Sequence, residues 1–433
     1  MNHQPQSGLR LYNSLSREIE PVAPEEDPVS VYVCGITPYD ATHLGHAFTY
    51  AMLDVIIRYL EFRGREVTYV QNVTDIDDDI LRKAREVDEN WKDLGHRWTA
   101  LFIRDMIELN VRPPDRFPRA TDVIPQIIEV VQRLLAAGLA YESGGSVYFH
   151  IDAWPAYGKL SRLSRDEMLP IANERGNDPD DPNKRDPLDF VLWQAKAPGE
   201  PAWESPWGPG RPGWHIECST MALHFLGTPI DLHSGGADLT FPHHESEIAQ
   251  AQGSTGKAPF VRCWAHTAMV HYEGEKMSKS LGNLVMVRDL LERWTPDTLR
   301  LYLAAHHYRD AWSHNRAELD RARELSRKLN AAARARSGDR QPLDPERGRS
   351  AFTAAMDDDL DTPLGLKRLE EQADRILDAV DGVRSVQAAQ AALISMGRVF
   401  GLRFDTPGPE SRVARQWRRY LKDFDQGTTT HSQ

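Results

Sequence analysis

The stretch of sequence that decides the fold is VSVYVCGITPYDATHLGHAFTYAMLDVIIRYLEFRG, residues 29–64. It opens with a short β-branched run, VSVYVCG (29–35), which ends in a glycine and is typical of a strand. From His43 to Gly64, apolar residues recur at helical spacing. The run EVTYVQNVTDIDD (66–78) begins as a second strand and ends in an Asp-rich turn. This order predicts a βαβ unit, and therefore a parallel sheet that binds ligands at the carboxyl ends of its strands.

Four potential metal ligands lie in or beside motif-like stretches of the chain. Cys34 ends the first predicted strand, Cys218 lies in GRPGWHIECSTMA, and His243 and Glu247 lie four positions apart in GGADLTFPHHESEIAQ. On a helix, residues four apart share one face, so the imidazole and the carboxylate can point at one ion. Two thiolates, one imidazole and one carboxylate suit zinc. A metal among such motifs predicts a role in binding substrate.

Composition indicates the general class of protein. The 433 residues are enough for two or three domains, and 40% hydrophobic with 27% charged residues is ordinary for a soluble globular protein. The N-terminus has no apolar core typical of a signal peptide, and no run approaches the ~18 apolar residues of a membrane span. Three cysteines far apart do not form a disulfide framework. We expect a cytoplasmic α/β protein that does not bind membranes and is a monomer.

The rest of the chain shows further predicted elements. Residues from about 80 to 145 read as largely helical, and the charged Pro/Gly/Asp segment 174–187 reads as a loop. Strands are expected near 188–193 and 229–233. From about 295 onward the pattern is helical, with two helices expected between AELDRARELSRKLNAAARAR and about residue 400.

Two motifs indicate phosphate chemistry. HLGH (43–46) lies at a predicted helix start, where exposed N–H groups and the helix dipole favour an anion. Its glycine permits close backbone approach, and its histidines can donate to phosphate oxygens as charge develops at an α-phosphorus. KMSKS (276–280) puts two lysines on a short loop that can hold a leaving pyrophosphate. The catalytic candidates are therefore His43, His46, Lys276 and Lys279.

These motifs together resemble the signature of class I aminoacyl-tRNA synthetases. The fuller strings are similar to cysteinyl-tRNA synthetase and to its close relative, the cysteine ligase of mycothiol biosynthesis. The strings that carry the resemblance are YVCGIT, HLGHA, NVTDIDD, LDFVLW, PGWHIECS, GGADLTFPHHESEIAQ and EKMSKSLGN. The similarity runs from about residue 9 to 405 with the order and spacing retained.

The resemblance implies an α/β architecture. The expected arrangement is a class I synthetase-type, Rossmann-like parallel sheet with an inserted connective region, followed by a C-terminal α-helical bundle. The domain limits are 1–112 and 201–295 for the two halves of the catalytic domain, 113–200 for the connective insertion, 296–405 for the bundle and 406–433 for a polar tail with a short basic helix.

The resemblance also implies the roles of individual residues. One zinc ion would be held by Cys34, Cys218, His243 and Glu247. The pocket for substrate cysteine would be lined by Gly35, Thr37, Thr74, Trp214 and His243. ATP, accompanied by Mg²⁺, would be bound by His43, Gly45, His46, Ser234, Gly235, Gly236, Asp238, Lys276 and Lys279. Ser234 departs from the family pattern, in which a glycine is common at this position.

Three functions are possible. The first two differ in the acceptor of the cysteinyl group, and the third involves no catalysis. The resemblance implies that L-cysteine and ATP give cysteinyl-adenylate, from which a ribose hydroxyl of tRNA-Cys takes the cysteinyl group. The alternative acceptor is the amine of glucosaminyl-inositol, as in the mycothiol ligase. GITPYDATHLGHA is closer to that ligase, and the anticodon-reading ending usual in bacterial synthetases is not seen, whereas KMSKSLGNLVMVRDLL is closer to the synthetase. A catalytically silent paralogue is the third possibility, against which the intact motifs argue.

Several other residues have both a functional and an ordinary interpretation. A basic helical face beside aromatic residues either contacts tRNA or is a solvated surface; it comprises Arg412, Arg415, Arg419 and Lys422, with Trp417 and Tyr420 nearby. We expect Asp75, Asp77, Asp78 and Asp79 to form a solvated, helix-starting turn. Glu217 is not expected to bind the metal directly but can orient the ligands. Ordinary packing or surface positions are expected for His244, Glu245, Cys263, His306 and His307.

Overall fold

The predicted βαβ unit is present and forms the centre of a parallel sheet. The computed structural model describes residues 8–23, 27–277, 282–404 and 412–425. Strand β3 (Val29–Ile36), helix α1 (Leu44–Phe62) and strand β4 (Val67–Val73) follow one another, and β3 pairs in parallel with β4. The other strands of the sheet are β9 (Ile230–Gly236) and β10 (Val261–Thr267), in the order β10-β9-β3-β4 with every pair parallel. The predicted α/β class is confirmed.

The strand order creates a switch point at the centre of the sheet. From β3 the chain continues through α1 to β4 on one side, whereas β9 pairs with the other side of β3. Connections that leave in opposite directions open a crevice outside the carboxyl ends of the two strands. The crevice therefore lies beyond Ile36 and Gly236, where Thr37 and the HLGH motif follow β3.

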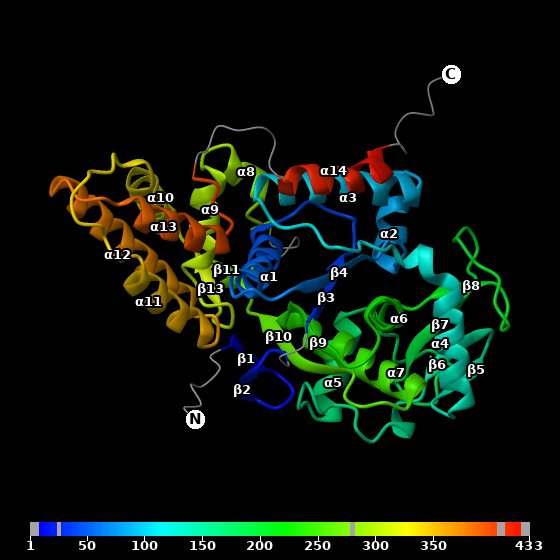
Figure 1. Ribbon diagram of the computed structural model, residues 1–433. Helices are drawn as coiled ribbons and strands as arrows, with labels where there is room; N and C mark the ends of the chain where they lie inside the picture. The colour runs from blue at the N-terminus through cyan, green and yellow to red at the C-terminus, as the bar shows by residue number, and fades with distance from the viewer. Residues whose placement is uncertain (1–7, 24–26, 278–281, 405–411, 426–433) are drawn as a thin grey trace, which may run out of the picture.

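A long insertion separates β4 from β9. It contains a four-stranded antiparallel sheet in the order β5-β6-β7-β8, beside helices that cover the right-hand side of the molecule in Figure 1. Its elements are α2 (Asp78–Val87), α3 (Trp91–Glu108), α4 (Ile124–Ala136), β5 (Ala140–Ser143), β6 (Ser146–Phe149), α5 (Arg165–Glu174), β7 (Phe190–Ala195), β8 (Gly210–Pro212) and α6 (Trp214–Leu226). Between β9 and β10 lie a 3₁₀ turn (Ala237–Leu239), a π-type turn (Thr240–His244) and α7 (Glu245–Thr255). The domain limits given above remain predictions.

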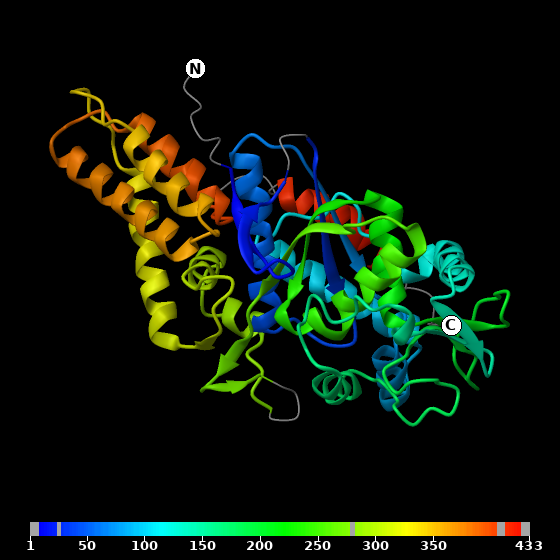
Figure 2. The same cartoon turned by 90° about the horizontal axis from the view of Figure 1, so that it is seen from below.

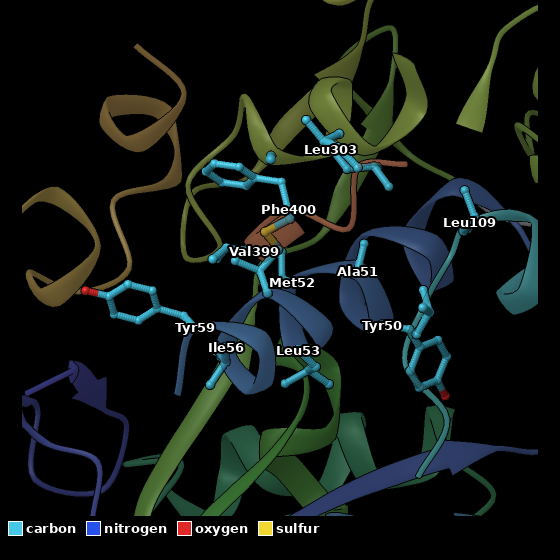
Figure 3. Close-up of a cluster of buried hydrophobic side chains, with 14 of the residues drawn as sticks. Tyr50, Ala51, Met52, Leu53, Ile56, Tyr59, Leu109, Leu303, Val399 and Phe400 are labelled. Atoms are coloured by element: carbon cyan, nitrogen blue, oxygen red, sulfur yellow. The ribbon is translucent and has the colours of Figure 1, made fainter. Parts of the chain in front are cut away.

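Helix α1 is buried on nearly all sides because it lies between the parallel sheet and the helical bundle. Its sequence is apolar around most of its circumference, which is typical of such a central helix. Figure 3 shows its side chains packed against residues from three other segments; the labelled cluster is Tyr50, Ala51, Met52, Leu53, Ile56, Tyr59, Leu109, Leu303, Val399 and Phe400. Gly64, at φ +83°, takes the left-handed conformation that follows the helix end.

The helical bundle occupies the left of Figure 1 and projects from the catalytic sheet, as Figure 2 shows from below. Its helices are α9 (Pro296–Ala304), α10 (Arg316–Arg334), α11 (Glu346–Asp357), α12 (Thr362–Asp381) and α13 (Gln387–Val399). Between α10 and residue 400 the described chain forms three helices, where the sequence pattern predicted two. The reason is that Asp359 and Leu360 adopt positive φ, which interrupts the helical run between α11 and α12.

Small elements complete the chain at its start and around the KMSKS motif. Strands β1 and β2 form a hairpin, and β11 lies between β12 and β13 in a three-stranded sheet. The bounds are β1 (Arg10–Asn13), β2 (Glu18–Pro21), β11 (Val270–Tyr272), β12 (Glu275–Lys276), α8 (Val287–Leu291) and β13 (Trp312–His314). Among the described residues, no helix is long and apolar enough to cross a membrane.

The last helix of the described residues, α14 (Arg412–Asp425), packs back on the N-terminal half of the chain. It lies along α3 at the top of Figure 1. The side chains of Trp417 and Phe424 are buried against Phe117. Trp417, one of the aromatic residues beside the basic helical face, has an exposed fraction of 0% and is therefore not available to a nucleic-acid base.

Candidate active site

A cavity of about 970 Å³ lies in the crevice at the carboxyl ends of the central strands. Its walls come from the end of β3, the start of α1, the 3₁₀ turn after β9 and the segment 174–178 of the insertion. Residues far apart in the sequence thus face one space large enough for a nucleotide and an amino acid.

The HLGH motif forms the N-terminus of α1, as predicted. His43 is the N-cap, and its Nδ1 accepts a hydrogen bond from the Gly45 backbone N at 3.1 Å. The imidazole rings of His43 and His46 stack, with centroids 3.9 Å apart. A Cβ on Gly45 would lie 3.0 Å from the His43 ring, so the motif needs a glycine to keep this packing. The dipole of α1 favours a phosphate here, while the first N–H groups of the helix are bonded within the protein: Leu44 N donates to the Val285 carbonyl at 2.8 Å, and the Gly45 and His46 N–H groups donate to His43.

The four predicted metal ligands meet at one point behind the cavity. Their donor atoms all lie within 4.8 Å of one another, and all four residues are buried. Cys34 Sγ lies 3.3 Å from Glu247 Oε1, and His243 Nε2 lies 3.2 Å from the same oxygen. Cys34 comes from β3, Cys218 from α6, His243 from the π-type turn and Glu247 from α7. The group is able to hold a metal ion.

The donor set and its spacing fit zinc. Bonds of about 2.0 to 2.3 Å in a tetrahedral site place the ligand atoms about 3.3 to 3.8 Å apart, which agrees with the two distances above. Burial raises the pKa of the Cys34 thiol and of the Glu247 carboxyl and lowers the pKa of His243, so burial alone favours the uncharged groups. A divalent cation would supply the charge that stabilises two thiolates and a carboxylate in this setting.

A second possible ligand group shares two of the same residues. His233 Nε2 lies 3.0 Å from Glu247 Oε2, and Cys34, His233, His244 and Glu247 also gather within 4.8 Å. His233 and His244 do not line the cavity, whereas Cys34, Cys218 and His243 do. The predicted group therefore has three residues on the cavity wall, and the second group has one, Cys34.

The surrounding histidines form a layer that the sequence interpretation did not include. His215 Nδ1 lies 2.9 Å from His243 Nδ1, and His244 Nδ1 lies 2.8 Å from His266 Nε2. His244 was expected to be an ordinary packing residue; it lies within this buried layer. His215 follows Trp214 in the PGWHIECS string, and position in such a motif was the signal that would have found it.

The residues predicted to bind substrate cysteine line the same cavity as three of the four potential metal ligands. A Cβ on Gly35 would lie 1.6 Å from the Asn72 carbonyl oxygen, so no side chain fits at this position. The Trp214 ring stacks on His243 at a centroid distance of 4.4 Å and closes one side. All five predicted residues line the cavity, namely Gly35, Thr37, Thr74, Trp214 and His243.

The predicted ATP residues divide into two groups. Gly236 and Asp238 line the cavity, but Ser234 and Gly235 are not among the described residues that do. The Ser234 hydroxyl instead donates to the Ala265 carbonyl at 2.5 Å, inside the sheet, and so does not approach the expected ribose position. The sequence did not indicate Arg175, which lines the cavity and forms an ion pair with Asp238 at 3.3 Å.

The lysines of KMSKS fall at the limit of the described residues. Lys276 belongs to β12, and its strand position is described but its side chain is not. Lys279 lies outside the described residues. Met277 of the same motif is buried and lines the cavity close to Gly45, which brings this segment to the HLGH motif.

Among the acidic residues singled out in the sequence, Asp75 departs from the predicted solvated turn, whereas Asp77 does not. Asp77 caps α2 by accepting from the Asp79 backbone N, as a helix-starting turn requires. Asp75 is buried rather than solvated: its carboxylate accepts from the Thr121 backbone N and hydroxyl, and burial raises its pKa to about 6. Glu217 is fully buried on α6, outside both ligand groups of the described residues, and burial raises its pKa.

Comparison with known proteins gives the class. A family model described as "tRNA synthetases class I (C) catalytic domain" matches residues 20–324, and one described as "DALR domain" matches residues 351–405. The chain belongs to the class I tRNA synthetase family, as the motifs predicted.

The relatives indicate the branch of this family. The chain is 44% identical over 372 residues, 85% of its length and 88% of the relative's, to the L-cysteine:1D-myo-inositol 2-amino-2-deoxy-alpha-D-glucopyranoside ligase of Thermomonospora curvata. It is also 44% identical over 363 residues, 83% of its length and 78% of the relative's, to the cysteine–tRNA ligase of Dehalococcoides mccartyi. The chain is therefore an enzyme of the ligase class.

A solved structure supports the fold. The methionyl-tRNA synthetase of Mycobacterium tuberculosis in complex with methionyl-adenylate matches with a TM-score of 0.63 at 19% identity, covering 87% of this chain and 89% of that one. At this identity the similarity concerns the fold alone.

Proposed function

We propose that the enzyme activates L-cysteine with ATP in the cavity and transfers the cysteinyl group to the 3′ end of tRNA-Cys. The observation that carries this proposal is the meeting of two features in one cavity. One is a buried Cys/Cys/His/Glu group able to hold a metal, and the other is the HLGH helix N-terminus. The first suits a thiol substrate and the second suits the phosphates of ATP.

The residues of the chain supply positioning and charge for the first reaction. The carboxylate of cysteine attacks the α-phosphorus of ATP, which forms the acyl–phosphate bond and releases pyrophosphate. His43, His46 and the dipole at the start of α1 are proposed to stabilise the charge that develops on the phosphate oxygens. Lys276 and Lys279 are proposed to bind the leaving pyrophosphate, together with Mg²⁺.

The base and ribose of ATP are proposed to lie against Gly236 and Asp238. A Cβ on Gly236 would lie 2.5 Å from Asp238 Oδ1, so the turn is tight at the position where the nucleotide approaches. The ion pair with Arg175, which also lines the cavity, orients the Asp238 carboxylate. Asp238 is then placed to accept a hydrogen bond from a ribose hydroxyl.

Selection of cysteine depends on the proposed zinc site. Cys34, Cys218, His243 and Glu247 would hold zinc, which would bind the thiolate of substrate cysteine far better than the hydroxyl of serine. Trp214 and Gly35 restrict the space beside this point, because the indole closes one side and no side chain fits at position 35. A contact that serine cannot make gives discrimination without an editing step.

The amino sugar is the second candidate acceptor. A specific observation favours it: a relative that is 44% identical over 85% of this chain is named a cysteine ligase that acts on 1D-myo-inositol 2-amino-2-deoxy-alpha-D-glucopyranoside. Both candidates share the cysteinyl-adenylate and differ only in the nucleophile that follows, a ribose hydroxyl or a sugar amine.

Two assays on the full chain test the proposal. Cysteine-dependent exchange of pyrophosphate into ATP, compared with serine, tests activation, and zinc-loaded protein that gives no exchange would refute the enzymatic proposal. Parallel reactions with labelled cysteine, ATP and either tRNA-Cys or glucosaminyl-inositol test the acceptor. Label on tRNA is the expected result, and label on the amino sugar alone would replace the first candidate by the second.

A further inference from the structure

Helix α14 is attached to the catalytic half of the chain by its apolar face. Ala414, Trp417 and Phe424 are buried, at helical spacing along one side. The Trp417 indole N–H donates to the Val111 carbonyl at 2.8 Å, and the Tyr420 hydroxyl donates to the Pro114 carbonyl at 3.1 Å. The helix is thus held in a fixed orientation on α3 and the segment that follows it.

The opposite face of α14 is exposed and basic. The helix contains five arginines or lysines and two aspartates, in a chain whose net charge is −12. The exposed basic residues are Arg412, Arg415, Arg418, Arg419 and Lys422, which with Gln416 line a shallow groove. We refer to this surface, Arg412 to Lys422, as the basic face.

Three residues of the basic face, Arg412, Arg419 and Lys422, are not paired in the way that residues of other surface helices are. On α10, Arg323 pairs with Asp320 and Arg327 pairs with Glu324, three positions away in each case. Within the part of the chain that the structure describes, Arg412, Arg419 and Lys422 have no carboxylate within ion-pair distance. Their positive charge is available to a partner.

The positive charge continues from α14 onto the catalytic half of the chain. Burial and the Asp115 carboxylate raise the pKa of Tyr420, and the guanidinium groups of Arg116 and Arg419 lie close enough to offset part of that rise. Arg116 and Asp115 are both exposed at this junction. The junction therefore carries arginines from both sides, the helix and the segment beneath it, together with one carboxylate.

We propose that the basic face binds the phosphodiester backbone of the acceptor tRNA. Arg412 and Lys422 are separated by ten residues, a rise of about 15 Å along a helix. That is the length over which a nucleic-acid strand carries about four phosphates. Because Trp417 and Tyr420 are used to attach the helix, the contact is electrostatic and does not include stacking on a base. The inference rests on the proposed function, since it assigns a surface to the tRNA that the reaction would use.

A charge-neutralised variant tests the basic face. Arg412→Gln/Arg419→Gln/Lys422→Gln in the full chain is compared with a control, Arg133→Gln/Lys257→Gln/Arg327→Gln, which removes the same charge from exposed positions on other elements. The probe is a tRNA-Cys transcript, and its Kd is measured over a range of salt concentrations. We expect binding about tenfold or more weaker, and a slope of log K against log salt lower by about 2 to 3, only in the α14 variant.

Pyrophosphate exchange and tRNA charging distinguish a failure of the basic-face proposal from a failure of the proposed function. Cysteine-dependent pyrophosphate exchange should be unchanged in both variants, because the substituted residues lie outside the cavity. If the parent charges tRNA and the α14 variant binds it with unaltered Kd and slope, the basic face is not a tRNA surface. If a DNA duplex binds the parent as tightly as tRNA-Cys does, and the α14 variant loses affinity for both to the same extent, the assignment to tRNA is overturned. A parent that exchanges pyrophosphate but neither binds nor charges tRNA would refute the proposed acceptor itself.

Discussion

At the scale of single residues, the candidate site depends on donor atoms that are buried and close together. Cys34 and Glu247 come within 3.3 Å although 213 positions separate them, and the sheet brings this about by placing β3 beside β9. The residue types and the spacing of His243 and Glu247 were enough to predict the group. The buried histidine layer around this group, which includes His215 and His266, was not predicted, because the sequence does not show which way a histidine ring points.

Cys218, a proposed metal ligand, gives the first prediction. Cys218→Ser should lower zinc affinity by about 100-fold or more, because a hydroxyl replaces a thiolate ligand. The selectivity for cysteine over serine in pyrophosphate exchange should fall with it. Zinc content is measured by elemental analysis of the purified protein. Cys263→Ser is the matched control: this cysteine is also buried, in β10, but lies outside the ligand groups and should retain zinc. Zinc loss with unaltered selectivity would contradict the proposed thiolate contact.

The second prediction separates the structural from the chemical role of His43. His43→Asn keeps an N-cap side chain that can accept from the start of α1, so the thermal unfolding midpoint should stay close to that of the parent. The imidazole is lost, and the turnover rate in pyrophosphate exchange should fall about 100-fold or more, with little change in the KM for cysteine. His43→Ala should show the same loss of rate and an additional loss of about 1 kcal/mol of stability. An active Asn variant would show that capping is the main role of this residue.

At the scale of elements, helices α1 and α14 show what a pattern can and cannot predict. The apolar circumference of α1 predicts a buried helix, and the structure confirms it. The pattern of α14 is amphipathic and predicts that one side is covered, but not by what. The sequence placed Trp417 and Tyr420 beside the arginines without showing which way they face; in the structure Trp417 faces α3 and the arginines face outward.

The attachment of α14 gives the third prediction. Trp417→Ala should weaken the attachment of this helix to the rest of the chain by a free energy of about 3 to 5 kcal/mol, because the indole is fully buried and its N–H is hydrogen-bonded. The amides of α14 should lose protection in hydrogen exchange, while cysteine-dependent pyrophosphate exchange stays near that of the parent. Tyr420→Phe, which removes only a hydroxyl, should cost about 1 kcal/mol and leave the helix protected. Protection that survives Trp417→Ala would show that the helix is held by other contacts.

At the scale of the whole molecule, the order of elements was predictable and their mutual contacts were not. The βαβ pattern and the motif order predicted a parallel sheet followed by a bundle, and the family match agrees. Contacts between distant segments depend on individual side chains. Asp54 lies in the middle of an apolar helical run, and nothing in its neighbourhood in the sequence indicates that Arg300 of the bundle meets it.

The Asp54–Arg300 pair gives the last prediction, which concerns how the bundle is joined to the catalytic sheet. Arg300 is 1% exposed and its Nη2 lies 2.6 Å from Asp54 Oδ2, while its Nε donates to the Phe400 carbonyl. Asp54 also accepts from Arg58 and from the Arg112 backbone N. Asp54→Leu should cost about 3 to 5 kcal/mol in urea unfolding, because it leaves a buried guanidinium without its carboxylate.

The matching variant decides whether this loss comes from the pair. Arg300→Met should cost less than Asp54→Leu, because Arg58 and the Arg112 N–H still satisfy the carboxylate. The double variant should be more stable than the sum of the two losses predicts, by about 1 to 3 kcal/mol, since it removes both charges together. Losses that simply add would mean that the two residues stabilise the protein independently. A coupled result would identify this ion pair, at the interface between α1 and α9, as a principal connection between the helix that carries His43 and the bundle.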